Sequence, residues 1–499
     1  MQVVWFKRDL RTTDHAPLVR AMIDAPTAGS VLPLYIHEPS WWAQPDTSGQ
    51  HIAFSRECVA DLAAQILALG GTLFEPVGEA VTVLEALWQQ TRFSKLLSYQ
   101  ETGLGHTFER DKAVKAWCKT RGVAWHEISQ NGVQRGTQFR EKGFSFRRHL
   151  TDVLTQTVRL PAELSWATPP GGNAALPAVR QDKPGRQRGG RSQALALLEA
   201  FLSPEKLLAY PRAISSPNTA LEGCSRLSPY LAFGVLSDGE VIRALYEKRL
   251  ALVEHLSEEK QYSLNQAVKF FVERLYWRAA YHQSFELNVE SEHQPELPTL
   301  AGHRESVVIP EWLEAWKAGR TGVPYVDAAM RMLAHTGWLN MRLRGTVVSF
   351  ALNELWLPWR EVGLHLAREF LDYDGAIHWS QLQIHAGSAA GCEPLSYDPR
   401  KQARDHDPQG AFVLQWVPEL ANVPMAYLVE PWTMSPRVQA QTRCHIGVDY
   451  PAPLVNLAQA HAAARDRVAA LRQGLTSPRT NFWSWREQQR VARVQGGLF

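Results

Sequence analysis

The chain has 499 residues, of which 45% are hydrophobic and 21% charged, and this composition excludes disordered, collagen-like and coiled-coil proteins. The net charge of +3 is too small to indicate nucleic-acid binding without a local basic face. The five cysteines form no CxxC pair, which argues against a disulfide framework and a standard zinc or iron–sulfur site. The 18 tryptophans indicate aromatic stacking or a large core.

The N-terminal sequence MQVVWFKRDLR has only a short apolar run before its charges and does not resemble a signal peptide. No stretch of about 18 apolar residues exists that could span a membrane. We therefore expect a cytoplasmic protein that does not associate with membranes, and we expect it to be a monomer.

Residues 1–130 alternate between two hydrophobic periods. Helical patterns at 52–69 and 79–91 separate short apolar runs, which lie at 3–6, 30–36, 72–77, 95–99 and 124–128. This alternation predicts a doubly wound parallel α/β domain. Because no GxGxxG follows the first apolar run, the usual dinucleotide-binding fingerprint is missing.

Residues 131–195 are predicted to connect two domains, since the segment 160–191 is rich in Pro, Gly and Arg. We interpret Arg186, Arg188 and Arg191 as part of a solvated linker, with phosphate contact as the alternative. Residues 196–475 are predicted to form a large all-helical domain, and 476–499 a short extension. Helical spacing of apolar residues occurs at 194–207, 238–252, 264–282, 311–318, 325–334, 343–354 and 454–471.

Four segments of the helical part contain groups that bind ligands in other proteins. In residues 223–234, Ser228 is predicted to cap a helix with Pro229 in its first position, and a phosphate fits such a helix start. Residues 271–278 carry a Trp-Arg pair after an apolar helix face. In residues 321–344, Asp327 and Arg331 are spaced to pair on a solvated helix face. Residues 370–379 carry two acids and a His, too few ligands for a metal site.

In this order, the motifs resemble the photolyase/cryptochrome family over nearly the whole chain. They are 4–11 (VWFKRDLR), 225–231 (SRLSPYL), 277–278 (WR), 321–331 (TGVPYVDAAMR), 336–338 (TGW), 359–361 (WRE), 372–374 (DYD) and 416–420 (WVPEL). The resemblance implies FAD inside the helical domain and often a second, light-harvesting pigment in the α/β domain. Glu101 lies just past a predicted strand end, where such a pigment could bind. The sequence leaves open whether the pigment is a folate, a deazaflavin, another flavin, a lumazine or absent.

The resemblance also implies the residues that contact FAD. Ser225 to Ser228 correspond to the pyrophosphate cradle, although Cys224 stands where the family usually has Thr. Arg344 and Asp372 correspond to the pair beside the isoalloxazine, and Asp374 to the acid near the ring and ribityl chain. The implied cofactor-binding residues are Tyr210, Cys224, Ser225, Arg226, Leu227, Ser228, Arg278, Met341, Arg344, Asp372, Asp374 and His378.

His378 takes the position that faces flavin N5, where the family usually has Asn, Asp or Cys. A histidine there can donate or accept a hydrogen bond and can change charge near neutral pH. We therefore expect His378 to influence which flavin radical survives after illumination.

Several family positions that serve DNA repair are altered. Arg274 replaces a Glu that binds the damaged pyrimidines, and the neighbouring Glu273 is expected on another helix face, since adjacent residues are about 100° apart. Trp277 is kept and can stack on a base, whereas the second aromatic wall aligns with Ile384. Met341 and Gly345 replace further pocket residues, including the His pair of (6-4) photolyases.

The family's chain of three tryptophans that supplies electrons is also altered. Only the middle position, Trp359, is kept, while Leu382 takes the flavin-proximal position and Ser306 the surface position. A different route is conceivable through other aromatic residues, which are Trp338, Trp356, Trp379 and Tyr373, although we expect Trp338 to be a packing residue.

These observations favour a cryptochrome-like, blue-light-absorbing flavoprotein with Trp277, Arg274, His378 and Trp359 as its reactive residues and an unidentified signalling protein as its partner. The alternative is a divergent DNA photolyase, a deoxyribodipyrimidine photo-lyase. Its phosphate contacts on damaged DNA would come from Arg147, Arg148, Arg342 and Arg404. A light-independent flavin protein, acting as a redox or binding module, is the third hypothesis.

Overall fold

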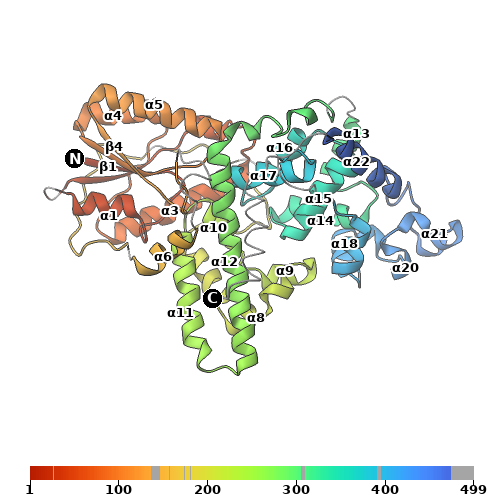
Figure 1. The fold of residues 1–499 in the computed structure, drawn as a ribbon. Helices are drawn as coiled ribbons and strands as arrows, with labels where there is room; N and C mark the ends of the chain where they lie inside the picture. Colours follow the sequence, from red (N-terminus) through yellow and green to blue (C-terminus); the bar gives the residue numbers. More distant parts are fainter. Residues whose placement is uncertain are drawn as a thin grey trace.

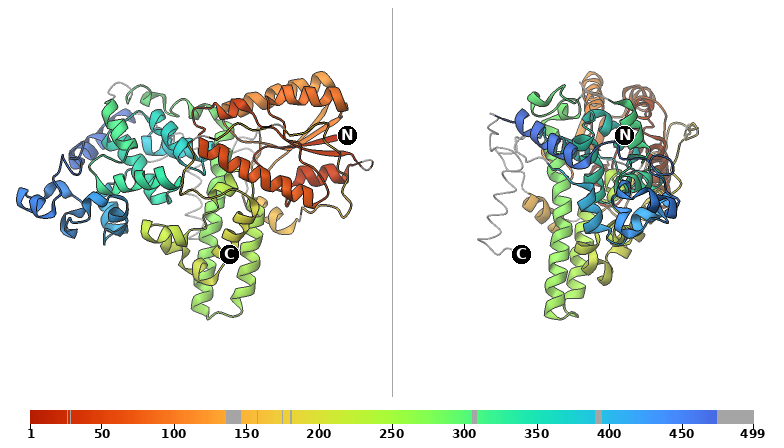
Figure 2. Two further views of the ribbon diagram at one scale, coloured as in Figure 1. Left: turned by 180° about the vertical axis from the view of Figure 1, so that it is seen from behind. Right: turned by 90° about the vertical axis from the view of Figure 1, so that its right-hand side faces the viewer.

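The computed structural model describes residues 1–25, 27, 29–135, 146–156, 158–173, 175–179, 181–304, 309–389 and 395–473. An α/β part built around one sheet is followed by a helical part, as the sequence predicts (Figure 1). The long helix α12, Glu258–Leu287, runs between the two parts and extends beyond them together with α11, Asp238–Val253 (Figures 1 and 2).

The sheet is parallel with the strand order β2-β1-β3-β4. Its strands are β1 Gln2–Phe6, β2 Val31–Tyr35, β3 Lys95–Tyr99 and β4 Ala124–Ile128. The strands β1 and β2 are buried along their whole length, which explains why they read as continuous apolar runs. Helices α1, Ala16–Ile23, and α3, Gly49–Ala68, cover one face, and α4, Ala80–Thr91, and α5, Gly105–Arg121, cover the other (Figure 1).

The strand predicted at residues 72–77 is wrong. This segment forms only two isolated parallel bridges, Leu34 to Phe74 and His37 to Val77. Pro76 has no N–H group to donate, so the segment cannot continue a regular ladder along β2.

The described helices outside the sheet layers are α2 Pro39–Trp42, α6 Phe146–Thr155, α7 Arg191–Phe201, α8 Pro204–Ala213, α9 Pro217–Gly223, α10 Ser228–Ala232, α13 Pro310–Lys317, α14 Pro324–Thr336, α15 Met341–Ser349, α16 Trp359–Glu369, α17 Gly375–Ala386, α18 Pro399–His406, α19 Ala411–Trp416, α20 Met425–Leu428, α21 Pro436–Thr442 and α22 Leu457–Leu471. A π-helix at Phe350–Glu354 continues α15, and 3₁₀ turns lie at Val289–Glu292, Pro298–Leu300, Pro418–Leu420 and Pro431–Thr433. The helix expected at 194–207 is divided into α7 and α8, because Ser203 caps α8 and Pro204 cannot continue α7.

Asp327 does not pair with Arg331 on a solvated face. The Asp327 side chain is fully buried and accepts hydrogen bonds from Thr321, Gly322 and the Tyr450 hydroxyl. Arg331 instead pairs with Glu419 at 2.8 Å. The motif at 321–331 therefore fixes the loop that precedes α14, which is a structural task.

The basic end of the connector packs on the protein and is not a solvated linker. Arg186 is buried and binds the carboxylates of Glu57 and Asp182, and Arg191 binds Glu240. Arg188 is exposed and lies 3.2 Å from Glu57. These pairs attach the connector to α3 and α11. They leave no excess positive charge on these three arginines with which to bind a phosphate.

The two parts of the chain meet where the start of α3 reaches the end of α16. Ser48 and Gln50 donate to the carbonyl of Arg368, and His51 Nε2 lies 2.8 Å from the carbonyl of Phe370. His51 Nδ1 accepts from the backbone N–H of Ser48 at 3.2 Å. Burial lowers the pKa of His51 to about 4, so the ring is neutral and both its nitrogens are satisfied.

This geometry gives a prediction on acid stability. In the folded state His51 takes up a proton near pH 4, whereas in the unfolded chain it does so near pH 6.5. Stability therefore falls as pH drops through this window, and His51 contributes about 3 kcal/mol of that loss. We expect urea unfolding of His51→Gln to show a correspondingly smaller loss between pH 7 and pH 4. The exposed His255→Gln is the control, and an unchanged pH dependence in His51→Gln would contradict the assignment.

Candidate functional site

A cavity of about 1680 Å³ opens in the helical part, lined by residues of α6, α8, α10, α11, α12, α15, α17 and the loops between them. Every cofactor-binding residue implied by the sequence lines it, although they come from segments up to 168 positions apart. Those residues are Tyr210, Cys224, Ser225, Arg226, Leu227, Ser228, Arg278, Met341, Arg344, Asp372, Asp374 and His378. Trp277 and Arg274 also line the cavity, and Trp359 does not.

The cavity wall is basic. Its cationic side chains are Arg226, Arg249, Lys269, Arg274, Arg278, Arg342 and Arg344, against the acidic Glu273, Asp372 and Asp374. Seven cations against three carboxylates favour an anionic ligand. Glu273 and Arg274 both line the cavity, although adjacent residues of α12 are about 100° apart around the helix.

Two of the carboxylates are held by ion pairs. Arg344 donates to both oxygens of Asp372 at 2.8 and 3.0 Å. Asp374 is bound by His282 Nε2 at 2.8 Å and lies 3.5 Å from Arg278. Burial by itself would raise the pKa of Asp374, but His282, Arg278 and Arg8 together bring it below its usual value. Asp374 is therefore ionised at neutral pH.

His378 is fixed in one tautomer. Its Nε2 lies 2.9 Å from the carbonyl oxygen of Gly363, which can only accept, so Nε2 carries the proton. Burial lowers the pKa of His378 to about 4, and the ring is therefore neutral, with Nδ1 as an acceptor. The expectation that His378 changes charge near neutral pH is wrong, because the apolar surroundings disfavour the imidazolium.

The segment 224–228 lines the cavity in an irregular turn. Arg226 has φ = 57°, in the left-handed region, and its guanidinium packs 4.0 Å from the Trp338 ring. Helix α10 begins at Ser228 and its cap position is Leu227, so the predicted capping role of Ser228 is wrong. The Ser225 and Ser228 side chains remain available to the cavity. Burial raises the pKa of the Cys224 thiol to about 11, which leaves it protonated.

The rim contains an aromatic residue that the sequence analysis missed. Tyr397 lines the cavity, and a Cβ on Gly345 would lie 2.7 Å from its ring. The His385 ring lies 5.7 Å from that of Tyr397, and the Arg342 guanidinium 5.4 Å from it. The absent side chain at Gly345 is the sequence signal for this arrangement, since it leaves space for the ring.

The other predicted phosphate contacts are dispersed. Arg404 is exposed and pairs with Glu430, and the side chains of Arg147 and Arg148 lie outside the described residues.

Ile384 lines the cavity, so the position of the family's second aromatic wall is aliphatic in this chain.

A chain of aromatic rings leads from the cavity to Trp359. Tyr373 and His378 line the cavity, and the His378 ring lies 5.1 Å from both Tyr373 and Trp379. Trp379 is fully buried and packs edge-on against Trp359 at 5.7 Å. Trp379 lies close to Leu382 in α17. Leu382 occupies the family's flavin-proximal tryptophan position, which is therefore aliphatic in this chain.

The remaining aromatic candidates lie off this chain. Trp356 is held between Arg304 and Arg467, at 4.0 and 5.2 Å. Trp338 belongs to the core and to the cavity wall, as expected for a packing residue. Ser306 lies outside the described residues.

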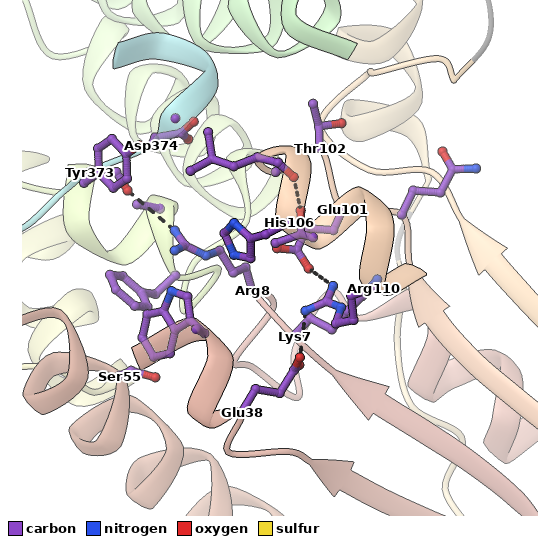
Figure 3. A pocket seen from close by; sticks show the side chains of 18 of the residues that line it. Lys7, Arg8, Glu38, Ser55, Glu101, Thr102, His106, Arg110, Tyr373 and Asp374 are labelled. Atoms are coloured by element: carbon purple, nitrogen blue, oxygen red, sulfur yellow. Dashed lines mark hydrogen bonds and ion pairs between the residues drawn. The ribbon is translucent and has the colours of Figure 1, made fainter. Parts of the chain in front are cut away.

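A second, smaller pocket lies at the carboxyl edge of the sheet, against the helical part (Figure 3). Its volume is about 120 Å³, and buried ion pairs fill its wall. Arg110 lies 3.2 Å from Glu38 and 2.7 Å from Glu101, and Lys7 lies 3.1 Å from Asp111. Burial is the main cause that raises the pKa of Glu38 to about 7. Tyr373 and Asp374 line both this pocket and the large cavity.

Among the described residues, no group of three or more His, Cys, Asp or Glu side chains is arranged to hold a metal ion. Within the same residues, no helix is both long and apolar enough to cross a bilayer.

Comparison with known proteins gives consistent matches along the chain. Residues 2–156 match the family described as DNA photolyase, and residues 271–470 match the FAD binding domain of DNA photolyase. The chain is 28% identical to cryptochrome DASH of Natronomonas pharaonis, over 91% of this chain and 98% of the relative. It is 27% identical to the deoxyribodipyrimidine photo-lyase of Vibrio cholerae, over 91% and 96%. In fold it is similar to a class III photolyase of Agrobacterium tumefaciens, with a TM-score of 0.80, 24% identity and coverage of 95% and 98%.

The packing beside His378 gives a prediction. A Cβ on Gly363 would lie 2.5 Å from the buried Trp379 ring and 2.7 Å from Leu382. Overpacking of this kind costs about 1–3 kcal/mol and exceeds the gain of about 1 kcal/mol that alanine brings to a helix. We expect Gly363→Ala to lower the free energy of unfolding and to change the Trp379 fluorescence. Gly171→Ala, where nothing lies within 4 Å, is the control, and equal stability of the two variants would contradict this packing.

Proposed function

The chain belongs to the photolyase/cryptochrome family, and on that premise we propose that it is a cryptochrome-like protein that absorbs blue light through FAD. The observation that carries this proposal is the large basic cavity, into which all the residues expected to contact FAD converge. The matched FAD binding domain confirms the predicted cofactor.

The residues of the cavity fit FAD at both its charged and its aromatic ends. We assign the pyrophosphate to the end formed by Ser225, Arg226 and Ser228, where hydroxyl donors and a cation meet. The Arg344–Asp372 pair, joined by two hydrogen bonds, would hold the isoalloxazine. When excited by blue light, bound FAD accepts one electron.

His378 distinguishes this site from those of the family, which usually have Asn, Asp or Cys at this position. With Nε2–H donated to Gly363, the ring offers only the acceptor Nδ1. We propose that it therefore stabilises a protonated flavin N5 and is unfavourable toward an unprotonated one. Arg344, as a fixed cation near the ring, favours negative charge on the flavin.

The electrons reach the cavity along Trp359 and Trp379. We propose that Trp379 replaces the missing tryptophan at Leu382, since its ring contacts both Trp359 and the cavity-lining His378. This route keeps the family's middle position and reaches the cavity through a neighbouring turn of α17.

The route is tested by replacing its two tryptophans. We expect Trp379→Phe and Trp359→Phe each to slow the photoreduction of bound FAD at least tenfold, because the electron loses its nearest donor. The measurement is flavin absorbance under blue light with an external reductant. The control is Trp356→Phe, a buried tryptophan off the route. If Trp379→Phe and Trp359→Phe slowed photoreduction no more than this control, the assignment would be contradicted.

We propose as the second candidate function light-dependent repair of DNA, and its specific observation is the pair of aromatic side chains at the cavity. Trp277 and Tyr397 both line it, and Arg274, Arg342 and Glu273 add polar groups. A flipped base can stack on such rings, each contributing about 1–3 kcal/mol. Tyr397 then forms the second aromatic wall, which the aliphatic side chain of Ile384 cannot form.

DNA binding separates the two functions. Repair predicts that the protein binds a duplex with a pyrimidine dimer more tightly than an intact duplex. It also predicts that Trp277→Ala and Tyr397→Ala each weaken that preference by about 1–3 kcal/mol, or roughly 5- to 150-fold. Trp316→Phe, inside the core and away from the cavity, is the control. Equal affinity of the wild type for both duplexes would rule out repair and leave the photoreceptor function.

We propose the small pocket at the sheet edge as the place of a second pigment. Its volume of about 120 Å³ is below the 300–1,000 Å³ of typical ligand pockets, so binding requires side chains such as Leu104 or the Glu38–Arg110 pair to move.

We also propose that the chain divides into an α/β domain at residues 1–130, a connector at 131–195 and an FAD domain at 196–475. The proposed partner of the photoreceptor is a signalling protein.

A further inference from the structure

Tyr373 lies between the two pockets. It lines both the large cavity and the small pocket at the sheet edge, and only 7% of its surface is exposed. It comes from the loop between α16 and α17, and its backbone carbonyl faces Arg8 at 3.5 Å, as Figure 3 shows. A single side chain therefore touches the cavity assigned to FAD and the junction of the two parts of the chain.

The hydrogen bonds of Tyr373 fix the direction of its phenolic proton. The indole N–H of Trp379 can only donate, and it binds the hydroxyl oxygen at 3.2 Å. The hydroxyl in turn donates to Asp46 Oδ2 at 2.8 Å, across 327 positions of sequence. The phenolic proton thus already points at a carboxylate that is 5% exposed and belongs to the α/β part.

Burial opposes a positive charge on the Tyr373 ring itself. The aromatic neighbours His51 and His378, at 6.1 and 5.1 Å, are neutral, because burial lowers the pKa of each to about 4. Burial also raises the pKa of the Tyr373 hydroxyl well above its usual value, so the phenol keeps its proton in the dark. An oxidised phenol in such surroundings has to lose its proton, and Asp46 is placed to take it.

We propose that Tyr373 is a redox-active residue and that Asp46 is its proton acceptor, an inference that rests on the proposed light-driven function. One electron leaves Tyr373 and reaches the light-excited flavin through Trp379, whose indole N–H binds the Tyr373 hydroxyl. The O–H bond of Tyr373 breaks and an O–H bond forms on Asp46 Oδ2. The products on the protein are a neutral tyrosyl radical and a neutral carboxylic acid, so charge and protons balance.

The proton moves from the helical part to the α/β part. Asp46 belongs to the wall of the small pocket together with Arg8, Lys7 and Arg110. Neutralising its carboxylate changes the charge of a wall that has four cationic side chains, with Arg278 as the fourth, and the further carboxyl groups of Glu38, Glu101 and Asp374. We infer that illumination changes the electrostatic balance at the junction of the two parts, which gives a physical signal that a partner can detect.

The test uses Tyr373→Phe, Asp46→Asn and the control Tyr325→Phe, a buried tyrosine that lines neither pocket. In wild type and control, illumination should produce a tyrosyl radical in electron paramagnetic resonance, together with an infrared band of a newly protonated carboxyl group. Tyr373→Phe should lose both signals. Asp46→Asn should lose the infrared band and form the radical at least tenfold more slowly. Dark FAD absorbance and the unfolding midpoint establish that each variant is folded and loaded.

Three outcomes overturn the inference in distinguishable ways. Photoreduction of wild type without a tyrosyl signal, or a tyrosyl signal that persists in Tyr373→Phe, overturns the role of Tyr373 and leaves the proposed function intact. A carboxyl band that persists in Asp46→Asn overturns the role of Asp46. Wild type that binds FAD but shows no photoreduction overturns the proposed function and this inference with it.

Discussion

The segment at residues 370–374 is the constraint on which the rest of the site depends. Each of these five consecutive residues makes at least one hydrogen bond to a distant part of the chain. The contacts are the Phe370 carbonyl with His51, the Leu371 N–H with Gly337, Asp372 with Arg344, the Tyr373 hydroxyl with Asp46, and Asp374 with His282. A displacement of this segment would therefore move the wall of the large cavity and the junction of the two parts together.

The buried charges of this segment are weak evidence for stability. Removing two charges from water is costly, and well-packed apolar residues are often as stable as a buried ion pair. Asp372 and Asp374 are nevertheless held by Arg344 and by His282 with Arg278, at the boundary of a large basic cavity. Their arrangement is better explained by the task of positioning a cofactor than by the folding of the helical part.

Sequence reasoning predicted the structural features that depend on the local pattern of apolar and polar residues. The alternation of apolar runs and helical spacing indicated the parallel sheet, because buried parallel strands read as continuous apolar runs. It failed at 72–77, where Pro76 interrupts the ladder. The long motifs of the helical part identified residues that the structure does gather around one cavity.

Contacts between distant segments could not be predicted in the same way. The burial of Asp327 and the bond from Tyr373 to Asp46 depend on how helices pack, and adjacent sequence carries no trace of them. The position of Tyr397 is signalled only by the missing side chain at Gly345. Likewise, the acceptor-only character of His378 follows from the carbonyl of Gly363 and from burial, while its residue type alone allowed a charge change near neutral pH.

A crystal structure of the purified, dark-kept protein with its own cofactor tests the central claim most directly. The account predicts FAD in the large cavity, with its pyrophosphate at Ser225–Ser228 and its isoalloxazine in contact with His378 and Tyr373. An isoalloxazine that lies elsewhere in the cavity, separated from both residues by other side chains, would contradict it.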